Sequence, residues 1–132
     1  TNPFIYEFIE DADNTFKKGP CAGYRAPDAS FNSSTLFTLL QKKPMHLLLF
    51  GHKKLDVNYL EKLKALENIY IDWLQVHHFT VSLANQNLFQ RYGVTSSASY
   101  VIRPDGYIGF RSFGSDLTLV ENYLKTLFQK NQ

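Results

Sequence analysis

The apolar run His46–Phe50, which Gly51 closes, constrains the fold more than any other part of the sequence. Its residues do not alternate between apolar and polar, and such a run is typical of a strand buried on both faces of a sheet. We therefore expect a sheet with helices packed on both sides of this strand. The run is too short to cross a bilayer, which takes about 20 apolar residues in a helix.

A helix and a second strand are expected directly after this run. Asp56 is placed to cap a helix that extends to about Glu67, and Tyr70–His78 is rich in the β-branched and aromatic residues that strands favour. Strands that a helix separates are expected to run parallel. The apolar residues of the helix recur at three-residue spacing, which predicts one buried face made of Val57, Leu60, Leu63 and Leu66.

Two more helices follow in the second half of the chain. Asn85 is placed to cap a short helix over Gln86–Tyr92, and Gly93 is placed to end it with left-handed backbone. Asp116 is placed to cap the last helix. Its apolar residues recur at three- and four-residue steps and predict a second buried face made of Leu117, Val120, Leu124, Leu127 and Phe128.

The clearest local signal is a β-hairpin near the C-terminus. Ser99–Arg103 and Tyr107–Arg111 have strand composition, and Pro104-Asp105-Gly106 lies between them. Proline presets the φ angle of a turn, and Asp-Gly tolerates the positive φ that follows, so the two strands are expected to be antiparallel neighbours.

The order of these elements predicts an α/β, thioredoxin-like three-layer fold. Its mixed sheet has a βαβαββα core over about 46–129, preceded by an N-terminal extension at 24–40. In the extension, Ser33-Ser34 is expected to cap a short helix over 35–40. Gly19-Pro20 punctuates the chain, so we expect residues 1–22 to be an arm or linker and residues 23–132 to be the thioredoxin-like domain.

Composition and charge exclude several classes of partner. The chain has 132 residues, which suits one domain, and its net charge is only +2. A charge so close to neutral does not favour nucleic acid or an acidic membrane surface as a partner. No signal peptide begins the sequence, so we expect a soluble, cytoplasmic protein. The absent initiator Met suggests a processed chain or an excised fragment.

The cysteine content argues against the thiol redox chemistry that is common in thioredoxin-like proteins. In redox-active thioredoxins the nucleophilic Cys follows the first core strand, at a helix N-terminus that lowers its pKa. Here that place reads Gly51–Asp56 and contains no sulfur, and 94–98 has no Pro where those proteins carry a cis-Pro. The one thiol in the sequence, Cys21, is expected to be incidental, and a thiol peroxidase that uses it is the weakest alternative function.

Three basic residues, His52, Lys53 and Lys54, stand ahead of the helix that Asp56 caps. Cations beside a helix N-terminus can hold an anion such as phosphate. The alternative function is therefore a small binding module that uses residues 51–55 for an anionic ligand or a protein.

No motif in the chain points to catalysis or to a bound metal. The nucleotide-binding patterns GxGxxG and GxxxxGK[ST] and the hydrolase pattern GxSxG are absent. His77 and His78 point to opposite faces of the expected strand and cannot share one ion. We therefore expect no catalytic, cofactor-binding or metal-binding residue in this chain.

Two stretches resemble a known family of enzymes. Gly23–Ala29 resembles the GxRAPD segment that opens the C-terminal domain of FAD-dependent aromatic-ring hydroxylases, the phenol hydroxylase-like group A flavoprotein monooxygenases. Arg91-Tyr92-Gly93 and Tyr100–Arg111 resemble the YG and RPDGY signature of the same domain. The resemblance extends from about Gly23 to about Leu127. Its signature positions are Gly23, Arg25, Pro27, Asp28, Gly93, Arg103, Pro104, Asp105, Gly106 and Arg111.

The resemblance implies an accessory role for this chain. Full-length members of the family carry separate FAD and substrate domains, and they use NADPH or NADH to hydroxylate aromatic rings. Their C-terminal domain is thioredoxin-like, lacks the cysteines, packs on the other domains and in some members contributes to a homodimer. FAD and NAD(P)H are therefore expected in the full-length parent and not in this chain.

The signature residues also have structural interpretations. Arg25 and Arg111 are expected to tie the extension to the hairpin, and Asp28 is expected to accept a hydrogen bond from a backbone N–H in a turn. Separation from the other domains is expected to expose an aromatic patch that could drive association, with Phe4, Tyr6 and Phe8 as its candidates.

Overall fold

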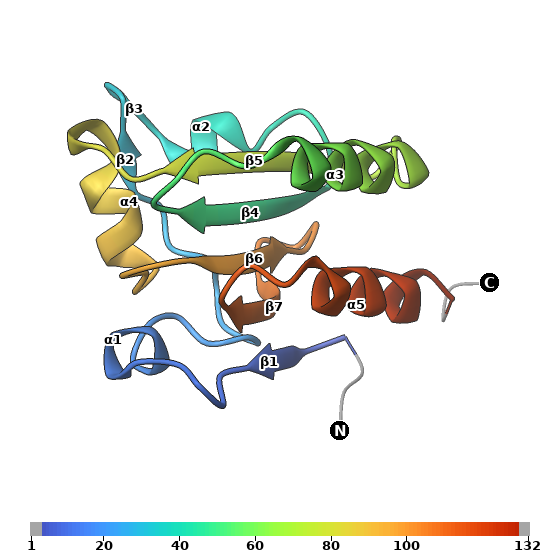
Figure 1. Cartoon of the computed structure of the whole chain (residues 1–132), viewed down its shortest axis with the longest axis horizontal. Helices are drawn as coiled ribbons and strands as arrows, with labels where there is room; N and C mark the ends of the chain where they lie inside the picture. Colours follow the sequence, from blue (N-terminus) through green and yellow to red (C-terminus); the bar gives the residue numbers. More distant parts are fainter. Residues whose placement is uncertain (1–3, 130–132) are drawn as a thin grey trace.

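The computed structural model describes residues 4–129, and its centre is a five-stranded mixed sheet (Figure 1). The strands, in the spatial order β1-β7-β6-β4-β5, are β1 (Tyr6–Phe8), β7 (Ile108–Phe113), β6 (Ala98–Ile102), β4 (Met45–Gly51) and β5 (Leu74–Thr80). β6 is antiparallel to both of its neighbours, whereas β4 with β5 and β1 with β7 are parallel pairs. A separate antiparallel ribbon joins β2 (Ser30–Phe31) to β3 (Ser34–Thr35).

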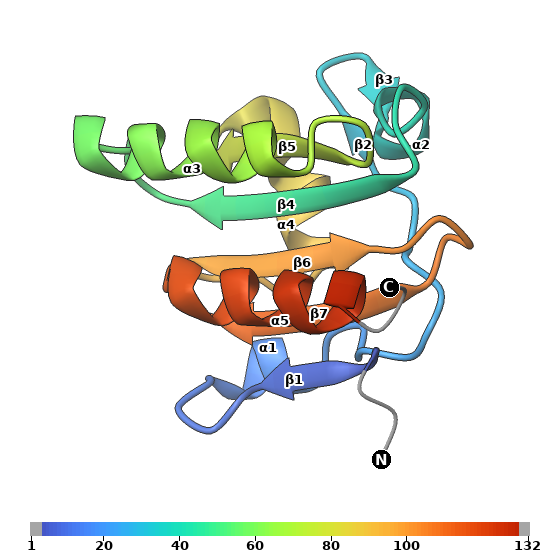
Figure 2. The ribbon, with the colours of Figure 1, turned by 90° about the vertical axis from the view of Figure 1, so that its right-hand side faces the viewer.

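Two long helices cover one face of the sheet (Figure 2). They are α3 (Val57–Ile69) and α5 (Leu117–Gln129). Their buried leucines and valine pack against alternate residues of β4 in a core that contains Met45, Leu47, Leu49, Leu63, Leu66, Leu117, Val120 and Leu124. The helices expected after Asp56 and Asp116 are therefore confirmed, and each aspartate accepts a backbone N–H of the first turn.

Shorter elements cover the opposite face. These are α1 (Asn14–Lys17), α2 (Leu36–Leu39), the 3₁₀ turn η1 (Leu83–Asn85) and α4 (Gln86–Arg91). Their core is rich in rings, and the Phe50 ring lies with its centroid 5.1 to 5.9 Å from those of Phe79, Phe89, Tyr92 and Tyr100. With helices on both faces of a mixed sheet, the fold is the expected α/β class and is consistent with a thioredoxin-like arrangement.

The expected hairpin is present. β6 and β7 pair antiparallel, with a β-bulge between Val101 and Ile102. Gly106 closes the turn with a φ of 85° and donates its N–H to the carbonyl oxygen of Arg103 at 2.9 Å. The Asp-Gly pair in the sequence predicts this positive φ.

Several expectations about single elements are corrected by the structure. The strand expected at 70–78 begins only at Leu74, because Tyr70 accepts the N–H of Trp73 and closes a turn ahead of it. Val57 and Leu60 of α3 are 68% and 41% exposed, so the buried face is narrower than its spacing predicts.

The third correction concerns helix caps. Asn85 does not cap α4, because its side chain accepts the N–H of Ser82 and donates to the carbonyl of Thr80. Thr35, rather than Ser33-Ser34, caps α2 by accepting the N–H of Thr38.

The segment expected as an arm or linker is built into the sheet. Strand β1 pairs in parallel with β7, and the Phe16 side chain of α1 is fully buried in the core. These contacts come from residues far apart in sequence, so the local Gly19-Pro20 signal does not reveal them. Residues 1–3 and 130–132 of the expected ranges lie outside the described residues. Within residues 4–129, no helix combines the length and apolar character that a membrane crossing requires.

Arg111 joins this N-terminal segment to β7. Its guanidinium is fully buried, and Nε donates to Glu7 Oε1 at 2.8 Å. Nη1 donates to the carbonyl oxygen of Phe16 at 2.6 Å, and Nη2 donates to that of Lys17 at 3.3 Å. The guanidinium also lies over the Phe16 ring, 4.5 Å from its centroid. Arg111 therefore ties the hairpin to residues 7–17, ahead of the extension at 24–40 that it was expected to hold.

Replacing Arg111 is expected to destabilise the fold strongly. Arg111→Met keeps the apolar stem but removes the cation that pairs with Glu7 and one donor to each of the Phe16 and Lys17 carbonyls. Breaking a buried ion pair costs roughly 3 to 5 kcal/mol. Urea unfolding measures the loss. Arg103→Met is the control, because Arg103 pairs with Asp105 at the surface, where the expected cost is below about 1 kcal/mol. Equal losses in the two variants would contradict this account.

Gly93 and Gly106 offer a second matched comparison. Both have left-handed backbone, with φ of 68° and 85°. A Cβ at Gly93 would lie 2.8 Å from the Thr15 carbonyl oxygen, whereas a Cβ at Gly106 meets nothing within 4 Å. We expect Gly106→Ala to cost about 1 kcal/mol and Gly93→Ala roughly 1 to 3 kcal/mol more, measured by thermal unfolding. Similar losses of stability in the two variants would show that the backbone around Thr15 can move to accommodate the added Cβ.

Candidate functional site

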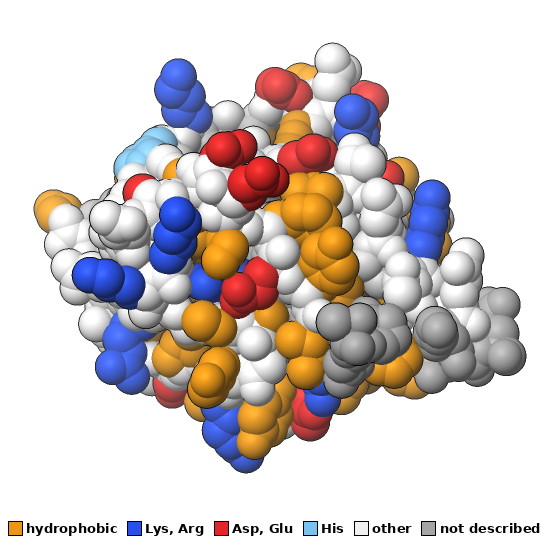
Figure 3. All heavy atoms as spheres, turned by 90° about the horizontal axis from the view of Figure 1, so that it is seen from below, with side chains coloured by type: hydrophobic (Ala, Val, Ile, Leu, Met, Phe, Trp, Pro, Cys, Tyr) orange, Lys and Arg blue, Asp and Glu red, His pale blue; other side chains and the backbone are white. Residues whose placement is uncertain are grey.

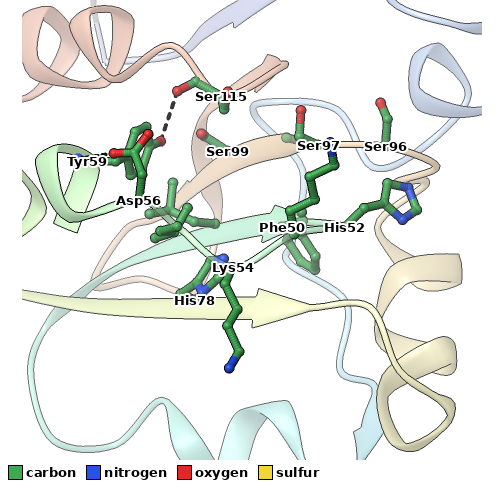
Figure 4. A pocket seen from close by; sticks show the side chains of 15 residues that line it. Phe50, His52, Lys54, Asp56, Tyr59, His78, Ser96, Ser97, Ser99 and Ser115 are labelled. Carbon is green, nitrogen blue, oxygen red and sulfur yellow. Dashed lines mark hydrogen bonds between the residues drawn. The ribbon is translucent and has the colours of Figure 1, made fainter.

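A pocket of about 340 Å³ opens at the carboxyl end of β4, the place where redox-active thioredoxins carry their cysteine. The loop to α3, the residues ahead of β6 and the residue ahead of α5 surround it (Figure 4). Its lining is Leu49, Phe50, Gly51, His52, Lys53, Lys54, Leu55, Asp56, Tyr59, His78, Ser96, Ser97, Ala98, Ser99 and Ser115. The pocket therefore combines an apolar floor with several hydroxyl groups.

Tyr59 connects the two helices at this pocket. Its hydroxyl donates to the carbonyl oxygen of Ser115, just ahead of α5, at 2.9 Å. Burial, together with the nearby negative charge of Asp116, raises the pKa of Tyr59 to about 12. The hydroxyl therefore stays protonated and keeps donating at any physiological pH.

The three basic residues of the loop, His52, Lys53 and Lys54, all line the pocket. His52 hydrogen-bonds through Nε2 to the carbonyl oxygen of Thr95. Figure 4 shows Lys54 extending away from the serines, toward β5. Asp56 also lines the pocket and brings a carboxylate to it. The anion site expected at His52, Lys53 and Lys54 stays a prediction.

Sequence reasoning did not identify the hydroxyl-bearing side of this pocket. Ser96, Ser97 and Ser99 come from the segment that leads into β6, and Ser115 comes from the loop after β7. The one available signal was the concentration of serines at 96–99. These serines match no motif spacing, and only the pairing of β6 with β4 brings them beside the end of β4.

The two stretches that carry the family resemblance meet in space. Gly23 donates its N–H to the carbonyl oxygen of Ile108, and Arg25 bridges to Tyr107, so the first stretch lies along the hairpin. On its other side, Tyr92 donates its hydroxyl to the carbonyl oxygen of Pro27 at 2.7 Å.

The remaining signature residues shape turns and contacts. Asp28 Oδ1 accepts the N–H groups of Ala29 and Phe37, each at 2.9 Å, as expected of a turn aspartate. Asp105 binds Arg103 and accepts the N–H of Tyr107. Arg25, Arg103, Pro104 and Gly106 also line a pocket of about 230 Å³ near His46.

A buried histidine pair lies on the other face of the sheet from α3. Nδ1 of His46 and Nε2 of His77 are 3.0 Å apart, and both side chains are buried. The sequence places these residues 31 positions apart, and pairing of β4 with β5 brings them together. No group of three or more His, Cys, Asp or Glu side chains suited to a metal occurs among residues 4–129.

Cys21 lies half-buried beside Arg111. Its Sγ is 3.6 Å from Nη2 of Arg111 and 3.6 Å from the carbonyl oxygen of Gly19. It thus belongs to the cluster that fastens the N-terminal segment and does not line the pocket at β4.

Comparison with known proteins shows a shared fold. No model of a known protein family matches the chain, and no curated protein matches it. It resembles part of aklavinone-11 hydroxylase, solved with FAD and aklavinone, over 96% of this chain with a TM-score of 0.63 and 17% identity. It also resembles part of the rebeccamycin biosynthetic enzyme RebC, solved with reduced flavin, over 96% with a TM-score of 0.55 and 13% identity. The chain spans only 25% and 22% of those two chains.

The histidine pair makes stability depend on pH. Burial, and then the charge of His46, lower the pKa of His77 to about 4, and burial also lowers that of His46. Arg25 and Arg103, which line the pocket beside His46, add positive charge there. Between pH 6.5 and 4 the unfolded chain therefore binds more protons than the folded one, so the free energy of unfolding falls as pH falls through this window.

We expect His77→Gln to flatten this dependence, because glutamine does not titrate and can still hydrogen-bond to His46. Urea unfolding at several pH values between 7 and 5 measures the slope. His52→Gln, which leaves the pair intact, is expected to keep the parent slope. A slope that His77→Gln leaves unchanged would contradict the assignment.

Proposed function

We propose that this chain is a non-catalytic accessory domain of an FAD-dependent monooxygenase that hydroxylates aromatic compounds. The observation that carries the proposal is the meeting of the Gly23–Ala29 segment with the Tyr100–Arg111 hairpin in one anchored unit. The likeness in fold to segments of aklavinone-11 hydroxylase and RebC supports it. The parent protein would bind FAD and NAD(P)H in its other domains.

The residues at the position of a thioredoxin's catalytic cysteine support an accessory role. The pocket at the end of β4 contains no sulfur, and no cis peptide bond occurs among the described residues. The one cysteine is held in a structural cluster around Arg111. A thiol peroxidase that uses Cys21 is therefore disfavoured, because its thiol has no second cysteine in this chain to pair with.

We infer that β1 and its surroundings form the surface that packs on the FAD and substrate domains or on a second copy. β1 is an edge strand, Tyr6 is 49% exposed, and its ring stacks on Phe8 with centroids 4.7 Å apart. Between β1 and α5 lies a groove of about 280 Å³ lined by Tyr6, Phe8, Phe110, Leu119, Asn122, Tyr123 and Thr126. Figure 3 shows hydrophobic side chains gathered on this side of the molecule. Apolar patches of this kind mark contact surfaces.

The proposal predicts that the isolated chain binds no flavin but binds its companion domains. FAD added to the purified chain should be removed completely by gel filtration, because the chain has no fingerprint for a dinucleotide. The flavin and substrate domains of the same protein, expressed separately, should co-elute with the chain. Stoichiometric flavin retained on the chain would contradict the accessory role.

Matched tyrosine variants test the surface. Tyr6→Ser should weaken co-elution, or self-association if the contact is a homodimer, because it removes half-exposed aromatic area at the edge strand. Tyr24→Ser is the control, since Tyr24 is 67% exposed and does not line the groove. If the two variants weaken binding equally, or neither does, the surface lies elsewhere.

A further inference from the structure

Three polar side chains lie in one row across the sheet, and each has a polar atom that is buried. Strand register aligns His78 with Leu49, Leu49 with Ser99, and Ser99 with Ser112, so these side chains point to the same face. Nε2 of His78 and the Oγ atoms of Ser99 and Ser112 are buried and have no hydrogen-bond partner among the described residues. Buried polar atoms are nearly always paired, so a row of unpaired ones indicates a missing partner.

Two of these three groups line the pocket at the end of β4. Ser99 is 0% exposed, and with His78 it flanks Leu49, whereas Ser112 is not part of the lining. Figure 4 shows Ser97, Ser99 and Ser115 on one side of the pocket and His78 on the other. A molecule in the pocket therefore lies within reach of hydrogen-bonding groups that the chain itself leaves unused.

The charges around the pocket favour an uncharged ligand. Lys53 also lines the pocket, and the carboxylate of Asp56 in the wall offsets its positive charge, while Lys54 extends away from the serines. His52 is engaged with the backbone of Thr95. Burial lowers the pKa of His78, so its imidazole is neutral near pH 7. A neutral imidazole and a serine hydroxyl are partners that suit a hydroxyl group on the ligand.

We propose that this pocket binds a small, uncharged molecule with an apolar, ring-sized body and a hydroxyl group. The apolar body contacts Leu49, Leu55 and Tyr59, and the hydroxyl group bonds to Ser99 and His78. The volume of about 340 Å³ lies at the small end of the range for ligand pockets, roughly 300 to 1,000 Å³. This binding activity is separate from the accessory role and does not depend on it.

Benzyl alcohol is a suitable probe, with benzoate and inorganic phosphate as charged comparators. Titrated into the isotope-labelled chain, benzyl alcohol should shift the backbone NMR signals of residues 51–56 and 96–99 saturably. Benzoate and phosphate should bind at least ten-fold more weakly. No saturable shift with benzyl alcohol overturns the proposal, and tighter binding of either anion overturns it in favour of a basic anion loop.

Serine variants separate a ligand contact from a structural effect. Ser99→Ala should weaken benzyl alcohol binding roughly five-fold, the effect of one neutral hydrogen bond. It should leave thermal stability unchanged or higher, because its Oγ has no partner in the free protein. Ser112→Ala is the control, since it removes an equally buried, unpartnered hydroxyl outside the pocket. Equal weakening by both variants, or none by Ser99→Ala, overturns the assignment.

Discussion

The buried guanidinium of Arg111 is the interaction on which the rest of the structure depends. A buried charge is tolerated only where hydrogen bonds replace the water it has lost, and Glu7 with the carbonyls of Phe16 and Lys17 supplies those bonds. The same contacts hold β1 against β7 and set Phe16 in the core. Because β7 is also half of the hairpin that carries the Gly23–Ala29 segment, one side chain connects the N-terminal residues to the signature region.

This anchoring leaves the two ends of the sheet with different properties. At the β1 edge an aromatic surface faces outward, as a domain that packs on others requires. At the end of β4 a pocket opens beside the N-terminus of α3, and serines and a neutral histidine line it without any cysteine. The scaffold therefore has features of a docking unit and of a small binding site, and these features occupy separate regions.

Local signals in the sequence predicted much of the fold correctly. Asp56 and Asp116 cap the long helices, and Gly93 and Gly106 take the left-handed backbone expected of them, because caps and turns depend on neighbouring residues alone. The expectations failed where other contacts took precedence over the local pattern. Leu60 has the right spacing for a buried face, yet the position of α3 on the sheet leaves it exposed. Asn85 has the right chemistry for a cap, yet its amide is used by Ser82 and Thr80.

The sequence by itself determined the order of strands and helices from β4 onward, the hairpin and the absence of paired cysteines, since these follow from periodicity, turn chemistry and residue counts. Only the tertiary structure decided the candidate sites. Strand pairing brings His46 to His77, and strand register aligns His78 with Ser99 through Leu49. Such neighbours are set by which strands pair and in which register, a non-local choice that the packing of the whole core makes.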